Sequence, residues 1–129
     1  MPAAGKIIAG VVDDQAAMRG LVQVTLNQIG VTDVRQYPDG AGALEKLRLQ
    51  PVHILFSDYN MPNMDGLELL RQIRADQTFA KMAFILLTGR ADKELVQRAV
   101  QLGANNYLVK PFTAAQIKQK IEQVVGPLT

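Results

Sequence analysis

The sequence predicts an α/β fold in which five strands, each followed by a helix, form one parallel sheet with helices on both faces. Short apolar runs alternate five times with longer amphipathic stretches along the 129 residues. The runs are apolar at successive positions, which is typical of strands that are buried on both faces of a parallel sheet. This length suits one domain with one hydrophobic core.

The five apolar runs are short and are bounded by turn or charged residues, as buried strands are. In chain order they are Ile7–Val12, Val34–Tyr37, Val52–Phe56, Ala83–Leu87 and Tyr107–Val109. Gly10 interrupts the first run, which is tolerable because glycine weakens a strand without forbidding it. Five strand–helix units favour a flavodoxin-like (βα)₅ doubly wound sheet of strand order 2-1-3-4-5 over a Rossmann-like order.

The intervening stretches repeat apolar residues at the 3.6-residue spacing of amphipathic helices. The first helix is expected to end at Gly30 and the fourth at Gly103, because glycine adopts the left-handed backbone that closes a helix. The second helix is expected to start near Asp39. Asp65 and Thr113 are expected to cap the third and fifth helices.

Composition narrows the classes of function. Cysteine is absent, which excludes disulfides and thiolate chemistry, and His53 is the one histidine, expected in a strand without a chemical role. The net charge is +2, but the basic residues are spread along the chain and do not alternate with aromatic residues, so no DNA binding is predicted. The absence of an export signal or a long apolar stretch predicts a cytoplasmic protein without membrane insertion.

Polar side chains follow four of the five apolar runs. Asp13 and Asp14 follow the first run, Asp58 the third, Thr88 the fourth and Lys110 the fifth. Ligand sites of open α/β sheets lie outside the carboxyl ends of the strands, so we expect these side chains to converge. Taken singly, each has a simpler explanation as a helix cap or a solvated charge.

Three carboxylates in one pocket repel one another and need a cation. Oxygen ligands without histidine or cysteine favour a hard metal, either Mg²⁺ or Mn²⁺. The chemistry that this set of residues supports is phosphoryl transfer, in which a carboxylate attacks phosphorus to give an aspartyl phosphate. The metal and the lysine would neutralise charge on the transferring group.

These residues resemble those of the response-regulator receiver family over almost the whole chain. The strongest stretch is SDYNMPNMDGLELLRQIRAD, residues 57–76, in which the Asp, Met-Pro and Met-Asp-Gly pattern is highly specific to receivers. The Asp13–Asp14 pair, the LLTG around Thr88 and the YLVKPF from Tyr107 to Phe112 stand at the family spacing. The similarity, greatest to stand-alone chemotaxis receivers, implies one receiver domain over residues 1–129, with a core of about 5–126 and no output domain.

The resemblance implies a role for each residue of the site. Asp58 would be the phosphoacceptor and would bind Mg²⁺ together with Asp14 and the backbone carbonyl of Asn60. Asp13 would act mainly through a metal-bound water. Lys110 would pair with Asp58 at rest and with the phosphoryl group afterwards.

The resemblance also implies a moving part. Thr88 would swing toward the phosphoryl group, and Tyr107 would rotate into the space that Thr88 leaves. Pro111 would follow a cis peptide bond, which proline permits. Gly89 and Arg90 differ from the residues that are usual in chemotaxis relatives, so the sequence leaves the lifetime of the phosphorylated state open.

The partners implied by the resemblance are a histidine kinase as phosphodonor and, downstream, a flagellar motor switch protein or a phosphatase. The domain is expected to be a monomer without enzyme activity beyond its own phosphorylation and dephosphorylation. The signal would leave through the face formed by the fourth helix, the fifth strand and the fifth helix. The candidate contact residues on that face are Lys93, Val96, Val100, Tyr107, Val109, Thr113, Ile117 and Lys120.

Other functions share some of these features. A phosphate sink or shuttle in a phosphorelay, or a single-domain regulator of another histidine kinase pathway, would carry the same site residues. A phosphatase of the haloacid dehalogenase type needs a second aspartate two residues after the nucleophile, where this chain has Asn60. A basic adaptor for nucleotides or nucleic acid would bind in a salt-dependent manner.

Overall fold

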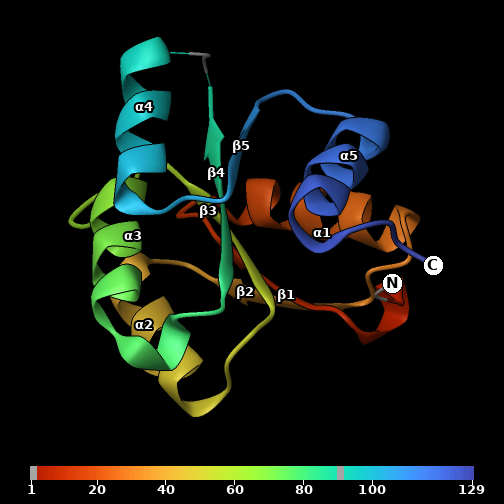
Figure 1. Ribbon diagram of the computed structural model, residues 1–129, viewed down its shortest axis with the longest axis horizontal. Helices are drawn as coiled ribbons and strands as arrows, with labels where there is room; N and C mark the ends of the chain where they lie inside the picture. The colour runs from red at the N-terminus through yellow and green to blue at the C-terminus, as the bar shows by residue number, and fades with distance from the viewer. Residues whose placement is uncertain (1–2, 90–91) are drawn as a thin grey trace.

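A computed structural model, which describes residues 3–89 and 92–129, confirms the predicted fold and the strand order 2-1-3-4-5 (Figure 1). The strands are β1 Ile8–Val12, β2 Asp33–Tyr37, β3 Ile54–Asp58, β4 Ala83–Thr88 and β5 Asn106–Val109. The helices are α1 Ala16–Gln28, α2 Gly40–Leu49, α3 Gly66–Ala75, α4 Lys93–Leu102 and α5 Ala114–Val125, with 3₁₀ turns η1 Ala4–Lys6 and η2 Gln77–Phe79. Within the described residues, no helix is both long enough and apolar enough to cross a membrane.

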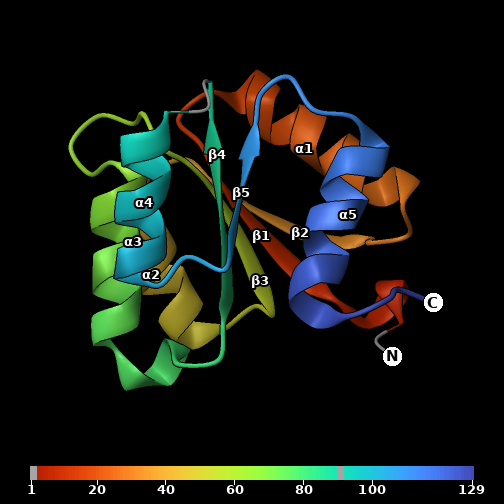
Figure 2. The same cartoon turned by 45° about the horizontal axis from the view of Figure 1, so that its top comes forward.

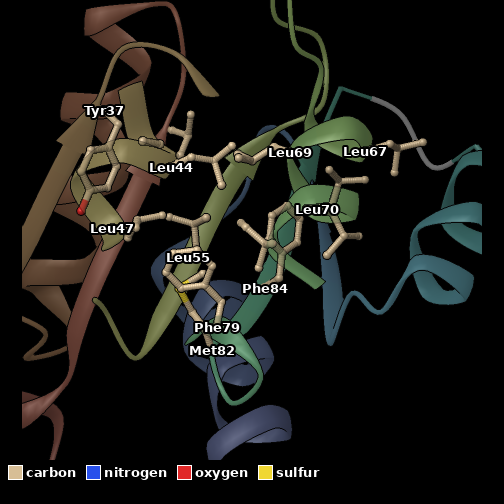
Figure 3. Packing of buried hydrophobic residues seen from close by; sticks show 14 of the residues in the cluster. Tyr37, Leu44, Leu47, Leu55, Leu67, Leu69, Leu70, Phe79, Met82 and Phe84 are labelled. Atoms are coloured by element: carbon tan, nitrogen blue, oxygen red, sulfur yellow. The ribbon is translucent and has the colours of Figure 1, made fainter. Parts of the chain in front are cut away.

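Helices cover both faces of the parallel sheet. Figures 1 and 2 show α1 and α5 on one face and α2, α3 and α4 on the other. Successive strand residues point to opposite faces, so Leu55 and Phe84 belong to the core cluster under α2–α4, part of which Figure 3 shows. Their neighbours Phe56 and Ile85 belong to the cluster under α1 and α5. Every residue of β3 and β4 is buried, as the continuous apolar runs predicted.

The third strand begins two residues later than predicted. Its pairing with β1 starts at Ile54, opposite Ala9, and it continues to Asp58. His53 is therefore exposed and lies before the strand, which corrects the prediction that it is a strand residue. Its Nδ1 accepts a hydrogen bond of 2.9 Å from the Ile8 N–H.

The predicted helix boundaries are confirmed at several caps. The side chains of Asp39, Asp65 and Thr113 each accept a hydrogen bond from a backbone N–H in the first turn of the helix that follows. Gly30 and Gly103, which follow α1 and α4, have φ angles of 92° and 104°. That left-handed region favours glycine because a Cβ atom is strained there.

The packing around β1 explains why a glycine, Gly10, lies inside this strand. A Cβ atom at Gly10 would lie 2.8 Å from the Leu55 side chain and 3.0 Å from the Tyr37 ring. Two large side chains from the neighbouring strands therefore occupy the space above this residue. The loss of strand propensity at Gly10 is offset by the packing of those side chains.

The 3₁₀ turn η1 and the segment after α5 lie side by side at the amino edge of the sheet (Figure 2). The Ala4 N–H donates a hydrogen bond of 3.2 Å to the Thr129 oxygen. The Leu128 N–H donates one of 2.9 Å to Glu122 Oε2. Ala4 is buried, and Leu128 packs against the cluster under α1 and α5. The packing under α1 and α5 thus includes residues on both sides of that contact.

Candidate functional site

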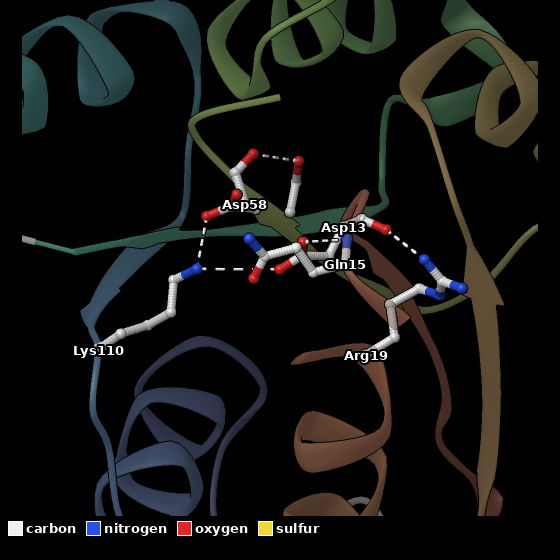
Figure 4. A network of polar contacts seen from close by, with 6 residues as sticks. Asp13, Gln15, Arg19, Asp58 and Lys110 are labelled. Atoms are coloured by element: carbon white, nitrogen blue, oxygen red, sulfur yellow. Dashed lines mark hydrogen bonds and ion pairs between the residues drawn. The ribbon is translucent and has the colours of Figure 1, made fainter. Parts of the chain in front are cut away.

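The carboxyl edge of the sheet brings the five predicted polar residues together. Asp13 and Asp14 follow β1, Asp58 and Thr88 end β3 and β4, and Lys110 follows β5. One carboxylate oxygen from each of the three aspartates lies within 4.8 Å of the other two. Figure 4 shows Asp13 and Asp58 facing Lys110 across this edge.

Lys110 is the cation that faces this cluster. Its Nζ donates a hydrogen bond of 2.7 Å to Asp58 Oδ1 and lies 3.8 Å from Asp13 Oδ2, which is too far for a hydrogen bond. The side chains of Lys110 and Asp58 are 19% and 10% exposed, so solvent screens their attraction only partly. One ammonium group offsets at most one of the three negative charges.

Asp13 is the most deeply buried of the three carboxylates, with 1% of the residue exposed. Its Oδ1 accepts a hydrogen bond of 2.9 Å from the Gln15 N–H, whereas its buried Oδ2 has no hydrogen-bond partner among the described residues. Burial raises the pKa of Asp13; the Gln15 hydrogen bond opposes this and the charge of Asp58 adds to it. A buried oxygen that accepts no hydrogen bond lowers the free energy of unfolding by about 1–3 kcal/mol.

The oxygen atoms of the three carboxylates are suitable ligands for a hard divalent cation. A cation beside Asp13 Oδ2 would satisfy the unpaired oxygen and reduce the repulsion among the three carboxylates. Mg²⁺ and Mn²⁺ take oxygen ligands of this kind. Asn60, which lies on the loop after β3 at the same edge, offers a backbone carbonyl close in sequence to Asp58.

Two residues that sequence reasoning missed hold the carboxylates in place. Arg19, in the first turns of α1, donates a hydrogen bond of 2.6 Å from Nη1 to the backbone oxygen of Asp13 (Figure 4). Ser57 donates one of 3.0 Å from Oγ to the backbone oxygen of Asp58. Both contact backbone atoms, so no side-chain motif marks them in the sequence.

A third missed residue is Gly66, where α3 begins beside β3. Its N–H donates a hydrogen bond of 2.8 Å to the Tyr59 oxygen. A Cβ atom at this position would lie 2.5 Å from the backbone oxygen of Asp58. The signal was present in the sequence, since glycine directly after the N-cap Asp65 is a poor helix former that needs a reason.

We expect Gly66→Ala to lower the free energy of unfolding by about 1–3 kcal/mol, because the added carbon meets backbone atoms that no rotamer change can move. Urea unfolding followed by circular dichroism measures this change. Gly20→Ala in α1 is the matched control: a Cβ there meets nothing within 4 Å, so it should stabilise by up to about 1 kcal/mol. Equal effects of the two substitutions would show that the contact with Asp58 is unimportant.

Thr88 and Tyr107 lie on neighbouring strands of the site. Thr88 is 3% exposed and pairs with Val109 in β5, and its carbonyl accepts a hydrogen bond of 2.8 Å from the Lys110 N–H. Tyr107 is half-buried. Lys120 in α5 places its Nζ 4.7 Å from the centre of the Tyr107 ring. The ring packs against the core cluster under α2–α4, and Lys120 approaches it from α5.

The loops beside the site contain two further predicted features. The peptide bond between Lys110 and Pro111 is cis, which confirms the prediction. Gly89 is exposed directly after Thr88. Arg90, on which the expectation about the phosphate lifetime also depends, lies outside the described residues.

The predicted partner surface needs one correction. Ile117 is fully buried, at 0% exposed, in the cluster under α1 and α5. It lies beneath the surface because it shares the inward stripe of α5 with Ile121. The other predicted contact residues are exposed or half-buried: Lys93, Val96, Val100, Tyr107, Val109, Thr113 and Lys120.

Comparisons with known proteins identify the family. The family model of the response regulator receiver domain matches residues 9–122. The chain is 44% identical to the probable chemotaxis protein CheY of Rhizobium etli over 128 residues, which are 99% of each chain. It is 41% identical to the chemotaxis protein CheY1 of Helicobacter pylori over 117 residues, 90% of this chain and 94% of that one.

A solved structure shows the same fold. The chemotaxis protein CheY4 of Vibrio cholerae matches with a TM-score of 0.84 and 29% identity, over 96% of this chain and 99% of that one. The family model spans most of the sheet and its helices, and the polar residues at the carboxyl edge lie inside the matched range. The chain therefore belongs to the response regulator receiver family of two-component systems.

Proposed function

We propose that this protein is a phosphorylation-dependent switch with Asp58 as the phosphoacceptor. The observation that carries the proposal is the 2.7 Å ion pair between Lys110 and Asp58 inside a cluster of three carboxylates. An Asp58 carboxylate oxygen forms the new bond to phosphorus as the bond from phosphorus to the donor breaks, and the donor leaves with that electron pair. Beyond this phosphorylation and its reversal, no enzyme activity is proposed.

The residues around Asp58 stabilise the transferring group. Once an Asp58 oxygen is bonded to phosphorus, Lys110 is close enough to pair with a phosphoryl oxygen instead. The Thr88 hydroxyl lies at the end of the neighbouring strand β4 and donates a hydrogen bond to the same group. Tyr107 then turns inward on the adjacent strand β5, which carries the signal toward α4 and α5.

Mg²⁺, or Mn²⁺ in its place, fits the three carboxylates of this site. Asp14, Asp58 and the backbone carbonyl of Asn60 would hold it, and Asp13 would act through a bound water. The bound cation supplies charge neutralisation for the phosphoryl group. The unpaired Asp13 Oδ2 beside two further carboxylates supports this assignment.

A histidine kinase is the proposed phosphodonor, since the chain is a receiver domain. The relatives named above are chemotaxis proteins, which supports a switch in chemotaxis or flagellar motor control. We propose with it that the protein is a cytoplasmic monomer. The exposed residues of α4, β5 and α5 would contact a motor switch protein or a phosphatase. Val100, at 59% exposed, is the most accessible large apolar side chain of α4.

Intact mass spectrometry with phosphoramidate tests the central step. We expect a gain of about 80 Da in the presence of Mg²⁺, as one phosphoryl group is added. The gain should be absent in EDTA and should disappear as the acyl phosphate hydrolyses. No gain, together with no Mg²⁺ binding by calorimetry, would contradict the proposal.

The contact between Lys120 and Tyr107 is expected to favour the position that the ring has in this structure over the position of the active form. Such a cation–π contact contributes about 0.5–1 kcal/mol at an exposed site, so Lys120→Gln should shift the switch toward the active conformation about two- to fivefold. The apparent dissociation constant for beryllofluoride should fall by the same factor. Lys118→Gln is the control, because Lys118 is exposed on the same helix without a ring contact among the described residues. An unchanged constant in Lys120→Gln would contradict the expected role.

A further inference from the structure

Arg19 of α1 is a cation next to the acidic cluster that contacts a peptide oxygen instead of a carboxylate. Its Nη1 donates the 2.6 Å hydrogen bond to the backbone oxygen of Asp13 (Figure 4). Its Nε donates a hydrogen bond of 3.3 Å to Gln36 Oε1 on β2. Within the described residues Arg19 forms no ion pair with any aspartate or glutamate. Direct pairing with an acidic side chain therefore does not explain where its guanidinium group lies.

The oxygen that Arg19 contacts belongs to the peptide bond between Asp13 and Asp14. A peptide group is planar, so the direction of this oxygen sets the direction in which the chain continues into Asp14. Asp14 is exposed, and its carboxylate accepts no hydrogen bond from the described residues. The direction in which Asp14 points therefore depends mainly on the orientation of its backbone.

The remaining contacts of Asp13 leave this oxygen to Arg19. The Asp13 N–H donates a hydrogen bond of 3.2 Å to the Tyr37 oxygen, and Asp13 Oδ1 accepts one from the Gln15 N–H. No group in the described part of the chain other than Arg19 donates to the Asp13 backbone oxygen. Since Asp13 is 1% exposed, a buried carbonyl would lose its partner if Arg19 were replaced.

The guanidinium group is itself held between α1 and β2. Long side chains on a helix point back toward its N-terminus, which brings Arg19 to the residues that precede α1. Gln36 accepts from Arg19 Nε on one side, and its own Nε2 donates to Gln23 Oε1 in α1. Because the guanidinium group is planar and rigid, fixing Nε also fixes the direction of Nη1.

We propose that Arg19 is a positioning residue of the metal site. It holds the peptide bond between Asp13 and Asp14 in the orientation in which both carboxylates serve one divalent cation, and Gln36 holds Arg19. Arg19 touches neither the cation nor the phosphoryl group. Groups that orient ligating carboxylates in this way commonly change metal affinity as strongly as a ligand does. This inference rests on the proposed function, because it needs a metal site at this edge of the sheet.

The charge of Arg19 alone would have the opposite effect on metal affinity. A guanidinium group near the site repels a divalent cation, so its removal would strengthen Mg²⁺ binding if charge were its only influence. The loss of a positioning contact would weaken Mg²⁺ binding instead. The direction of the change in affinity therefore separates the two roles.

Calorimetric titration of the full chain with Mg²⁺ tests the inference. Arg19→Met keeps the length of the side chain and removes its donors, and it should weaken Mg²⁺ binding about tenfold. Arg19→Lys keeps the charge but lacks the planar fork, so it should weaken binding only about threefold. Gln36→Leu leaves Arg19 in place without its Nε partner, and it should weaken binding about twofold.

Arg48→Met is the matched control. Arg48 lies in the last turn of α2, where its Nε is 3.4 Å from Asp76 Oδ2, and it contacts no residue of the acidic cluster. This variant should bind Mg²⁺ as the parent does. Urea unfolding in EDTA measures the stability of each variant separately, because a purely structural role would lower stability and leave the Mg²⁺ dissociation constant unchanged.

The outcomes distinguish this inference from the proposed function. Unchanged or tighter Mg²⁺ binding by the Arg19 variants, beside a parent that binds Mg²⁺, would overturn the positioning role alone. A parent that binds no Mg²⁺ would overturn the proposed metal site and this inference with it. If Arg19→Met does not fold, Arg19→Lys and Gln36→Leu decide, and parent-like affinity in both would overturn the positioning role.

Discussion

Asp58→Asn should abolish the phosphate gain from phosphoramidate and leave the protein folded. The amide oxygen of asparagine carries no negative charge, so it is a far weaker nucleophile toward phosphorus. Asparagine has nearly the same shape as aspartate, and the backbone of Asp58 is held in the β3–β4 ladder opposite Leu87. We therefore expect a mass spectrum without the added phosphoryl group and a circular dichroism spectrum like that of the parent.

The control for this experiment is Asp33→Asn. Asp33 lies on the edge strand β2, in an exposed ion pair of 3.6 Å with Arg35, far from the carboxyl-edge cluster. This variant should gain phosphate as the parent does. A phosphate that persists in Asp58→Asn would show that another carboxylate, such as Asp13 or Asp14, is the acceptor.

The local features of the fold could be predicted because each has a short-range cause. Continuous apolar runs marked the strands, and Asp65 and Thr113 marked helix starts that the structure confirms. The first residue of β3 could not be placed, because the apolar Val52 lies just before it and only the pairing of Ile54 with β1 shows where the strand begins. Ile117 was misplaced although its spacing from Ile121 already put both on the inward stripe of α5.

Contacts between distant segments escaped prediction for a different reason. Arg74 in α3 donates hydrogen bonds to the backbone oxygens of Phe79, Met82 and Gly103 and to the Asn105 side chain. Burial lowers the pKa of Arg74, yet nothing in its local sequence distinguishes it from an exposed arginine. Arg19, on the backbone of Asp13, is a second example. Such residues become visible only when the fold has brought their partners to them.

The second large effect is expected for Asp13→Asn, because the Asp13 carboxylate lowers the stability of the metal-free protein and is proposed to help bind the metal. In EDTA at pH 7, Asp13→Asn should raise the free energy of unfolding by about 1–3 kcal/mol, since it removes a buried charge whose Oδ2 has no donor. The amide group also reduces the repulsion from Asp58, which is one cause of the raised pKa of Asp13. Urea unfolding measures the change, with Asp33→Asn as the control.

The pH dependence of this gain has a defined sign. The pKa of Asp13 is raised by burial, so the folded state binds the proton more tightly than the unfolded state, whose pKa is near 3.8. The stability from this proton is fully present below that value and is lost as the pH rises through the folded pKa. The advantage of Asp13→Asn should therefore be small near pH 4 and grow toward pH 7. An advantage that is largest in acid would contradict the assignment to Asp13.

Mg²⁺ should reduce or reverse the difference in stability between Asp13→Asn and the parent. A ligand that binds the folded state alone stabilises it by about 2.7 kcal/mol at a hundred times its dissociation constant. The parent should gain this stabilisation, whereas Asp13→Asn, with one carboxylate fewer, should need much more Mg²⁺ to reach it. Equal stabilisation of both proteins at every Mg²⁺ concentration would show that Asp13 does not take part in metal binding. The three carboxylates repel one another, and one lysine offsets this repulsion only in part. A bound cation would offset the rest, which would explain why so unfavourable a cluster is kept at this edge of the sheet.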